Sequence, residues 1–311
     1  MNRRIFLMQS LIGAGAFALE SSAPGLDPKP ALQLSLAQWS LHKALQGGQL
    51  NHLDFPLKAA KDFGFNAVEY VSSFFGMGRM NPKEAAKNTA YLGELLQRSR
   101  DAGVVNHLIM VDEEGSLALP DDNERLQAVD NHKKWIEAAK FLGCRTVRVN
   151  LHGTGETGAK KTASIDSLSR LGEFAAPLGI HVVVENHGSD SSKGDWLASI
   201  MQQVNRENVG TLPDFGNFCI THPWGTTHEP CADEYDRYKG VKEMLPFAKA
   251  VSAKAYDFDN KGEQPLIDYK KMLGIVKKSG FTGYIGVEYE GNLQSEEEGI
   301  RLTKALIERY W

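Results

Sequence analysis

Cysteine is scarce: the 311 residues contain only Cys144, Cys219 and Cys231, and no two of them form a CxxC motif. An odd number leaves at least one thiol unpaired, whatever the other two do. We therefore expect these cysteines to be buried small apolar residues. The alternative is a disulfide between Cys219 and Cys231, which an oxidising compartment would permit.

Long runs of one charge, low-complexity tracts and short-period repeats are also missing. The formal net charge is only −4, which argues against nucleic acid as the main partner because nucleic-acid binding usually requires a basic patch. The turn after the first predicted strand, residues 40–48, has no GxGxxG fingerprint, so a dinucleotide-binding fold is disfavoured. The chain is nevertheless long enough to bury one large core.

The N-terminal residues do not belong to the predicted fold. Arg3 and Arg4 precede an apolar segment over residues 5–19, and this pattern resembles a twin-arginine export signal. The apolar segment is shorter than the roughly 20 residues that a membrane-spanning helix needs. We therefore expect residues 1–25 to direct export to the periplasm, with no stable membrane span after their removal. The alternative is an ordinary N-terminal anchor.

Short β-prone runs alternate with longer segments of helical spacing in the rest of the chain. The predicted strands are residues 32–40, 65–71, 104–112, 144–150, 180–186, 209–214, 250–256 and 284–290. The predicted helices are residues 52–63, 83–102, 121–142, 163–177, 194–204, 232–248, 267–279 and 295–310. Several helices stop at a glycine just before the next strand, which is typical of a helix C-cap.

Strand–helix alternation indicates a parallel sheet, and eight such units favour a closed (β/α)8 TIM barrel over an open sheet. We see no linker, so we predict a single α/β domain over residues 26–311. The longest predicted loop is residues 215–231. Long loops in compact domains are usually lids or binding loops.

Three predicted strands end in a carboxylate. Glu185, Asp214 and Glu288 close the fifth, sixth and eighth strands, and the active site of a TIM barrel lies at the C-terminal strand ends. Barrel closure would therefore bring three like charges together, and they would repel unless a cation lay among them. Oxygen ligands suit Mn²⁺ or Mg²⁺, and an added imidazole would favour Mn²⁺, Co²⁺ or Zn²⁺. The alternative for each carboxylate is an ion pair with a neighbouring Arg or Lys.

The segments VVVENHG (182–188), GTLPDFGNF (210–218) and GVEYEG (286–291) resemble those of the xylose isomerase-like TIM barrels, in the sugar phosphate isomerase/epimerase group. The resemblance covers nearly the whole chain after the N-terminal segment. It implies that Glu185, Asp214 and Glu288 bind one divalent metal ion, and that Glu185 and Glu288 form the acid/base pair of an epimerase.

The sequence departs from that family at two positions. The metal-binding histidine usual on the seventh strand is replaced by Ser252, a poor ligand, and Asn217 stands where epimerases often have a histidine. The metal would then have three protein ligands and additional water, or would recruit a histidine from elsewhere: His187, His222 or His228.

Other residues have less specific predicted roles. The residues expected to contact substrate are Trp39, Glu69, Arg148, Asn150 and Asn217. For Glu69 the alternative is an ion pair, and for Trp39 it is core packing. Lys254 either binds a substrate oxyanion or neutralises the carboxylates. Glu290, beyond Glu288 on the same face, is expected to be solvated.

The family's chemistry is proton abstraction next to the carbonyl of a small sugar or keto-sugar, through an enediolate, which gives isomerisation or epimerisation. His187 could replace one of the two glutamates in this proton transfer. Two other functions stay open. A lyase could perform β-elimination on a 3-keto-glycoside, which export would favour because sugar phosphates are mostly cytoplasmic. The barrel could also bind sugar without catalysis. The sequence leaves a homo-oligomer open as well.

Overall fold

The computed structural model describes residues 31–227 and 230–311, so the predicted export segment and His228 lie outside the described residues. Eight parallel strands follow the order β6-β5-β4-β3-β2-β1-β8-β7. They are β1 (Gln33–Ala37), β2 (Ala67–Val71), β3 (Val105–Met110), β4 (Thr146–Val149), β5 (His181–Glu185), β6 (Val209–Leu212), β7 (Val251–Ala255) and β8 (Tyr284–Tyr289). Each strand lies within its predicted range.

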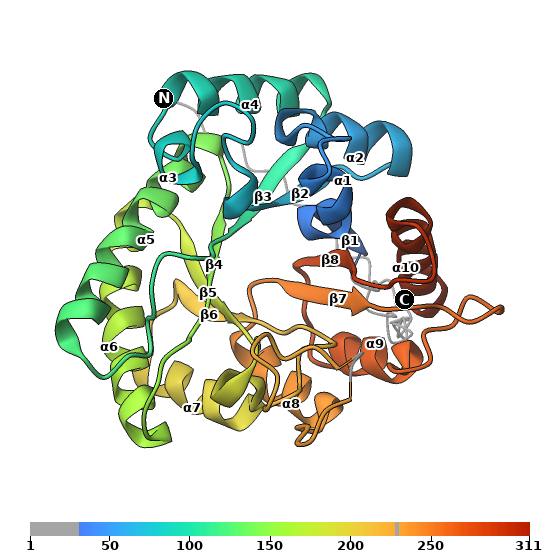
Figure 1. The fold of residues 1–311 in the computed structure, drawn as a ribbon. Coiled ribbons are helices and arrows are strands. Elements are labelled where there is room, and N and C mark those ends of the chain that lie inside the picture. Colours follow the sequence, from blue (N-terminus) through green and yellow to red (C-terminus); the bar gives the residue numbers. More distant parts are fainter. Residues whose placement is uncertain (1–30, 228–229) are drawn as a thin grey trace, which may run out of the picture.

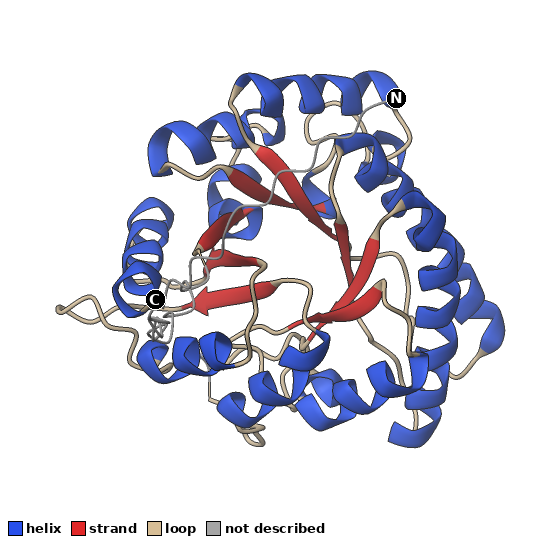
Figure 2. Ribbon diagram, turned by 180° about the vertical axis from the view of Figure 1, so that it is seen from behind, coloured by secondary structure: helices blue, strands red, loops and turns tan. Residues whose placement is uncertain are grey.

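The sheet curls until its edge strands β6 and β7 meet. They pair through two isolated parallel bridges, Thr211 with Ala248 and Asp214 with Ser252, rather than through a continuous ladder. The backbone N–H of Ser252 donates to the Pro213 carbonyl at 2.9 Å within this seam. Helices surround the ring of strands in both views of the chain (Figures 1 and 2). The predicted (β/α)8 TIM barrel is therefore confirmed.

The strands read as apolar runs because both of their faces are covered. All five residues of β2 are buried, and β5 is buried except at His181. In a parallel barrel, helices cover the outer face and side chains fill the interior. Charged residues at the ends of such strands therefore stand out from their surroundings, which is why the carboxylates were visible in the sequence.

The main helices are α1 (His42–Gln46), α2 (Phe55–Phe63), α3 (Pro82–Ala85), α4 (Thr89–Asp101), α5 (Asp122–Leu142), α6 (Thr157–Ala175), α7 (Gly194–Val204), α8 (Arg237–Met244), α9 (Tyr269–Lys278) and α10 (Glu296–Tyr310). Gly64 ends α2 in the left-handed conformation, as predicted for a C-cap. Within residues 31–227 and 230–311, no helix is long and apolar enough to cross a membrane.

The single helix predicted over residues 83–102 is instead two helices, α3 and α4. The side-chain oxygens of Asn81 and Asn88 accept hydrogen bonds from the N–H groups of Glu84 and Tyr91, at 2.9 and 3.0 Å. Each asparagine is thus an N-cap, and an N-cap residue has an extended backbone that a continuous helix cannot contain. The second cap was missed because Asn88 falls inside a run of helical spacing.

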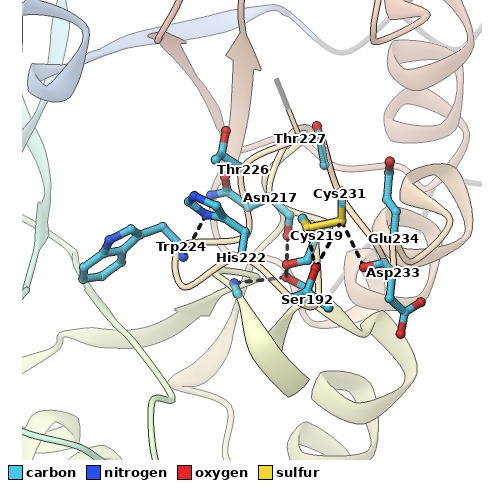
Figure 3. The surroundings of a disulfide bond; sticks show 12 residues. Ser192, Asn217, Cys219, His222, Trp224, Thr226, Thr227, Cys231, Asp233 and Glu234 are labelled. Carbon is cyan, nitrogen blue, oxygen red and sulfur yellow. Dashed lines mark hydrogen bonds between the residues drawn. A yellow bond between two sulfur atoms is a disulfide. The ribbon is translucent and has the colours of Figure 1, made fainter. Parts of the chain in front are cut away.

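The loop between β6 and α8 contains a disulfide bond between Cys219 and Cys231 (Figure 3). Our expectation of three buried thiols is therefore wrong for these two cysteines and correct only for Cys144, which is free and buried. The two half-cystines are 12 residues apart in sequence, and the described part of the loop between them returns to Gly188, just after β5, where the Pro223 carbonyl packs. Spacing alone cannot reveal this return, because it depends on the loop conformation.

We predict that replacing both half-cystines, Cys219→Ser with Cys231→Ser, lowers the free energy of unfolding by about 3 kcal/mol, the effect expected for closing a loop of this size. Guanidinium unfolding of the oxidised variant and wild type would measure the difference. Reduced wild type is the control and should match the variant. Equal stability of oxidised and reduced wild type would contradict the prediction.

Candidate active site

A cavity of about 460 Å³ opens among the C-terminal ends of the strands. Its volume falls within the range of small-molecule sites. Its walls include Arg148 on β4, Glu185 at the end of β5 and Glu288 on β8. Active sites of TIM barrels lie at this end, so the cavity is the candidate active site.

Glu185, Asp214 and Glu288 form a buried cluster at this cavity, in which one carboxylate oxygen of each lies within 4.8 Å of the others. Oδ1 of Asp214 accepts hydrogen bonds from the backbone N–H groups of Gly216 and Asn217, at 2.8 and 2.9 Å. Its other oxygen, Oδ2, is buried and has no hydrogen-bond partner among the described residues. One oxygen of the cluster is therefore buried without a hydrogen bond among the described residues.

Asn186 explains how Asp214 comes to lie beside Glu185. Its side-chain oxygen accepts the Asp214 N–H at 2.7 Å, and its side-chain NH₂ donates to the Asp214 carbonyl at 3.0 Å. A single amide thus fixes the backbone at the end of β6 against the end of β5. The Glu-Asn pair of VVVENHG therefore supplies both a carboxylate and the support for its neighbour.

Two buried cations accompany the carboxylates. Nε of Arg148 lies 2.9 Å from Oε2 of Glu185, as a close ion pair whose N–H is not aligned for a hydrogen bond. Nζ of Lys254 on β7 lies 3.5 Å from Oε1 of Glu288 and 3.1 Å from Oε1 of Glu290. Burial disfavours the charged form of Lys254, but Glu288 and Glu290 outweigh it and raise the pKa of Lys254 well above its ordinary value.

Burial also dominates the protonation of the acidic groups. It raises the pKa of Glu185 well above its usual value, with Arg148 opposing the shift and Glu288 adding to it. It raises the pKa of Asp214 to about 7, against the opposing charge of Lys254. The pKa of Glu69 also rises to about 7 by burial, despite the hydrogen bond donated by Ser35. Burial thus favours the protonated forms of Glu185, Asp214 and Glu69.

The cluster fits one divalent metal ion. Five carboxylates, counting Asp112 and Glu290, share the two cations Arg148 and Lys254, and the unpartnered Oδ2 of Asp214 is costly to bury unless a cation or proton meets it. Ser252 donates its hydroxyl to Oε2 of Glu288 at 2.8 Å. Within the described ranges no histidine joins the three carboxylates. A protein ligand set made only of oxygen suits Mg²⁺ or Mn²⁺.

His187 lies in the cavity wall and is held by a hydrogen-bonded chain. Its Nδ1 lies 2.9 Å from Oδ1 of Asn150, whose side-chain NH₂ donates to Asp112 at 2.7 Å. The Asp112 carboxylate thereby fixes the Asn150 amide with its oxygen towards the imidazole, so Nδ1 carries the proton. Burial lowers the pKa of His187 well below its usual value, and Arg148 adds to this effect. His187 is therefore neutral, with Nε2 unprotonated.

The predicted site residues occupy two layers. Those that line the cavity are Trp39, Arg148, Glu185, His187 and Glu288. Those that lie behind this lining are Glu69, Asn150, Asp214, Asn217 and Lys254. Asn217 links Glu185, which pairs with Arg148, to Lys254, which pairs with Glu288 and Glu290. Its side-chain NH₂ donates to Glu185 at 3.2 Å, and its side-chain oxygen accepts from Lys254 at 3.2 Å. Within the described chain, Glu69 neither lines the cavity nor pairs with a cation.

Some functional residues were not predicted. Asp112 binds both Arg148 and Asn150, each at 2.7 Å, and its position at a strand end was the available signal. Glu290 was expected to be solvated, but its side chain is only 17% exposed and pairs with Lys254. Trp224 reaches the cavity from the long β6–α8 loop, which lies in the range expected to form a lid or binding loop.

The family model of the xylose isomerase-like TIM barrels matches residues 57–307, so the chain belongs to the xylose isomerase-like TIM barrel family. The resemblance of the three motif segments is thus confirmed at the level of the family. An inosose dehydratase of Geobacillus thermodenitrificans is 25% identical over 142 residues, which are 40% of this chain and 46% of that protein. An inosose isomerase of Bacillus licheniformis is 24% identical over 208 residues, which are 59% of this chain and 69% of that protein. The matched region thus spans about half of the first relative.

Solved structures of low sequence identity share the fold. The IOLI protein with a zinc atom has a TM-score of 0.66 and 17% identity, over 90% of this chain and 99% of that one. A Mycobacterium smegmatis xylose isomerase-like protein in complex with magnesium has a TM-score of 0.62 and 17% identity, over 90% of this chain and 98% of that one. The 3-keto-D-glucoside 4-epimerase YcjR of E. coli has a TM-score of 0.62 and 13% identity, over 90% of this chain and all of that one. These likenesses establish the barrel.

The raised pKa of Glu69 predicts a pH-dependent effect of Glu69→Gln in metal-free protein. Between the ordinary value of 4.5 and about 7, the folded state keeps a proton that the unfolded chain releases, so stability falls as pH rises through this range. Glutamine removes the buried charge and can still accept the hydrogen bond from Ser35. We therefore expect Glu69→Gln to be more stable than wild type at pH 8, with the advantage vanishing towards pH 4.5.

Denaturant unfolding with chelator present, at pH 5 and pH 8, measures this difference. Glu308→Gln is the control because Glu308 is exposed on α10; it should change stability little at either pH. A Glu69→Gln effect of the same size at both pH values would show that the charge of Glu69 is not what the substitution removes.

Proposed function

We propose that this protein is a metal-dependent sugar isomerase or epimerase, which abstracts a proton next to a carbonyl and passes through an enediolate. The observation that carries the proposal is the buried Glu185, Asp214 and Glu288 cluster, with an unpartnered Asp214 oxygen, at a cavity of small-molecule size. Membership of a family whose matched relatives include a sugar isomerase and a dehydratase supports the same chemistry.

Glu185, Asp214 and Glu288 would hold the metal. When bound, the metal supplies Lewis-acid stabilisation of the negative charge that develops on the substrate oxygen. Ser252 and Lys254 orient the Glu288 carboxylate. The two N–H groups on Oδ1 hold the Asp214 carboxylate in place, and its Oδ2 stays without a hydrogen bond among the described residues. The protein thus prepares the ligand set before any substrate arrives.

The proton transfers fall to groups that border the cavity on different strands. Glu185 on β5 and Glu288 on β8 are placed to take a proton from the α-carbon and to return one. His187, whose Nε2 is unprotonated, can replace one of them as base. A proton returned to the opposite face of the same carbon gives an epimer, and one returned to the neighbouring carbon gives an isomer. Arg148, one of the cations in the cavity wall, would bind a sugar oxygen.

We also propose that the chain is exported. The twin-arginine-like sequence at residues 1–25 motivates this proposal, and the Cys219–Cys231 disulfide supports it because disulfides persist in oxidising compartments. An exported enzyme would meet free or oxidised sugars rather than sugar phosphates. Protease protection of the protein in intact cells, compared with lysed cells, distinguishes the compartments.

Elimination is the second candidate function. One matched relative is named a dehydratase and the other an isomerase, so the family accommodates both the loss of a substituent and the return of a proton. Elimination from a 3-keto-glycoside would begin with the same α-proton abstraction and end with the departure of the group on the β-carbon. Release of an aglycone would identify this outcome. A non-catalytic sugar-binding barrel would give neither exchange nor release.

The metal site predicts that purified protein contains about one equivalent of divalent metal, and that Mn²⁺ raises the melting temperature of the chelated protein. A ligand that binds only the folded state at a hundred times its dissociation constant stabilises by about 2.7 kcal/mol. Asp214→Asn should abolish this response. The control is Asp195→Asn, at an exposed aspartate on α7 outside the cavity, which should keep it. Less than about 0.2 equivalents of metal, with no response of wild type to Mn²⁺, would rule out the metal site.

The proton-abstraction step predicts that wild type incorporates deuterium from D₂O next to the carbonyl of a ketose or 3-keto-sugar. Glu185→Gln should lower the exchange rate by about 100-fold or more, because it removes a general acid–base group. Mass spectrometry of the recovered sugar measures the rate. Glu308→Gln should exchange as wild type does. Undiminished exchange by Glu185→Gln would remove Glu185 from the mechanism, and absence of exchange by wild type would favour the binding function.

A further inference from the structure

We propose that the cavity binds a glycoside, with the reacting keto-sugar over the carboxylate cluster and a second ring held at the mouth between Trp39 and Trp224. The proposal rests on the proposed function, because that function identifies the carboxylates as the reacting end. It adds a binding subsite for the non-reacting part of the substrate, and it names the substrate class as a keto-glycoside whose aglycone is itself a ring.

The cavity wall combines buried charged groups with two indoles and with the exposed charged residues Lys43 and Glu113. Glu185, Arg148 and Glu288 supply charge where the strands end. Trp39, in the turn after β1, and Trp224, in the β6–α8 loop, supply two indoles to the same wall. In the barrel, β1 and β6 are separated by β7 and β8 on one side and by four strands on the other. The indoles therefore reach the cavity from different sides.

Trp224 has an exposed surface that its surroundings hold in place. Its side chain is 50% exposed, although an exposed indole is unfavourable in water. Its ring packs edge-on against His152 at a ring distance of 5.3 Å and lies tilted against His187 at 5.2 Å. His187 belongs to the candidate active site, so the indole adjoins the reacting region.

The loop that carries Trp224 is anchored at several points. The Cys219–Cys231 disulfide closes it, and Figure 3 shows the indole of Trp224 directed away from that bond. The backbone N–H of Trp224 donates to Nδ1 of His222 at 3.2 Å. Gly188 has a positive φ, and a Cβ there would lie 2.2 Å from the Pro223 carbonyl oxygen. The loop thus packs directly on the end of β5, and the indole is preorganised.

Trp39 presents a second fixed aromatic surface. Its ring stacks on His42 at 4.7 Å with an interplanar angle of 11°, and it also stacks on Phe74 at 5.9 Å. Trp224 contacts His187 near the reacting end, yet half of its side chain stays exposed in the cavity wall. A second ring would cover it, because an aromatic or sugar ring offers a flat apolar face to an indole. This is the observation that favours a glycoside over a free sugar.

The test compares substrates that share the reacting sugar and differ only in the second part: 3-keto-glucose, its methyl glycoside, its phenyl glycoside and a 3-keto-disaccharide. Deuterium incorporation next to the carbonyl gives kcat/KM for each. Wild type should prefer the compounds with a second ring. Trp224→Ala should lower the ratio of kcat/KM for ring glycosides to that for 3-keto-glucose by about ten- to a hundredfold, mainly through KM. Trp224→Phe should fall between Trp224→Ala and wild type.

Phe141→Ala is the matched control, since Phe141 is an exposed aromatic residue on α5 outside the cavity; the ratio should stay at the wild-type value. Preference for the phenyl glycoside identifies an aromatic second ring, and preference for the disaccharide identifies a sugar. A wild type that exchanges deuterium into all four compounds equally, or a Trp224→Ala variant that loses both classes to the same extent, overturns this inference alone. Absence of exchange with every compound instead overturns the proposed function.

Discussion

The repulsion among three buried carboxylates is the constraint around which this end of the barrel is organised. Glu185, Asp214 and Glu288 are brought within 4.8 Å by β5, by the residues after β6 and by β8, and burial makes that arrangement costly. Arg148 on β4 and Lys254 on β7 offset part of the charge. One cation thus comes from β4, which flanks the three carboxylates beside β5, and the other from β7, which lies between β6 and β8. The arrangement leaves one site whose missing charge a metal can supply.

Much of the fold could be predicted because the barrel imposes strong local patterns. Strands buried on both faces must be apolar, so their ranges and the carboxylates at their ends were visible in the sequence. The same reasoning brought Glu185, Asp214 and Glu288 together, because parallel strands end at one rim. Asp112 was equally visible as a strand end, but its role was not, because its partners Arg148 and Asn150 lie on another strand.

The sequence does not show which residues the loops and the long side chains contact. The helix break at Asn88 depends on one side-chain hydrogen bond to Tyr91. Glu290 becomes partly buried because Lys254 extends between it and Glu288. Trp224 reaches the cavity through the course of a loop closed by a disulfide. Each outcome depends on distances between segments remote in sequence, which periodicity and spacing do not encode.

The acidic cluster spans the seam between β6 and β7. Backbone pairing is sparsest there, and Asp214 forms one of the two isolated bridges that join the edges. Its companions lie on opposite sides of that seam, Glu185 on β5 next to β6 and Glu288 on β8 next to β7. A bound cation would therefore link the two edges of the sheet, β6 and β7, where few backbone pairs join them. Metal binding would then also stabilise the closure of the barrel. Without metal, we expect the barrel to open first between β6 and β7.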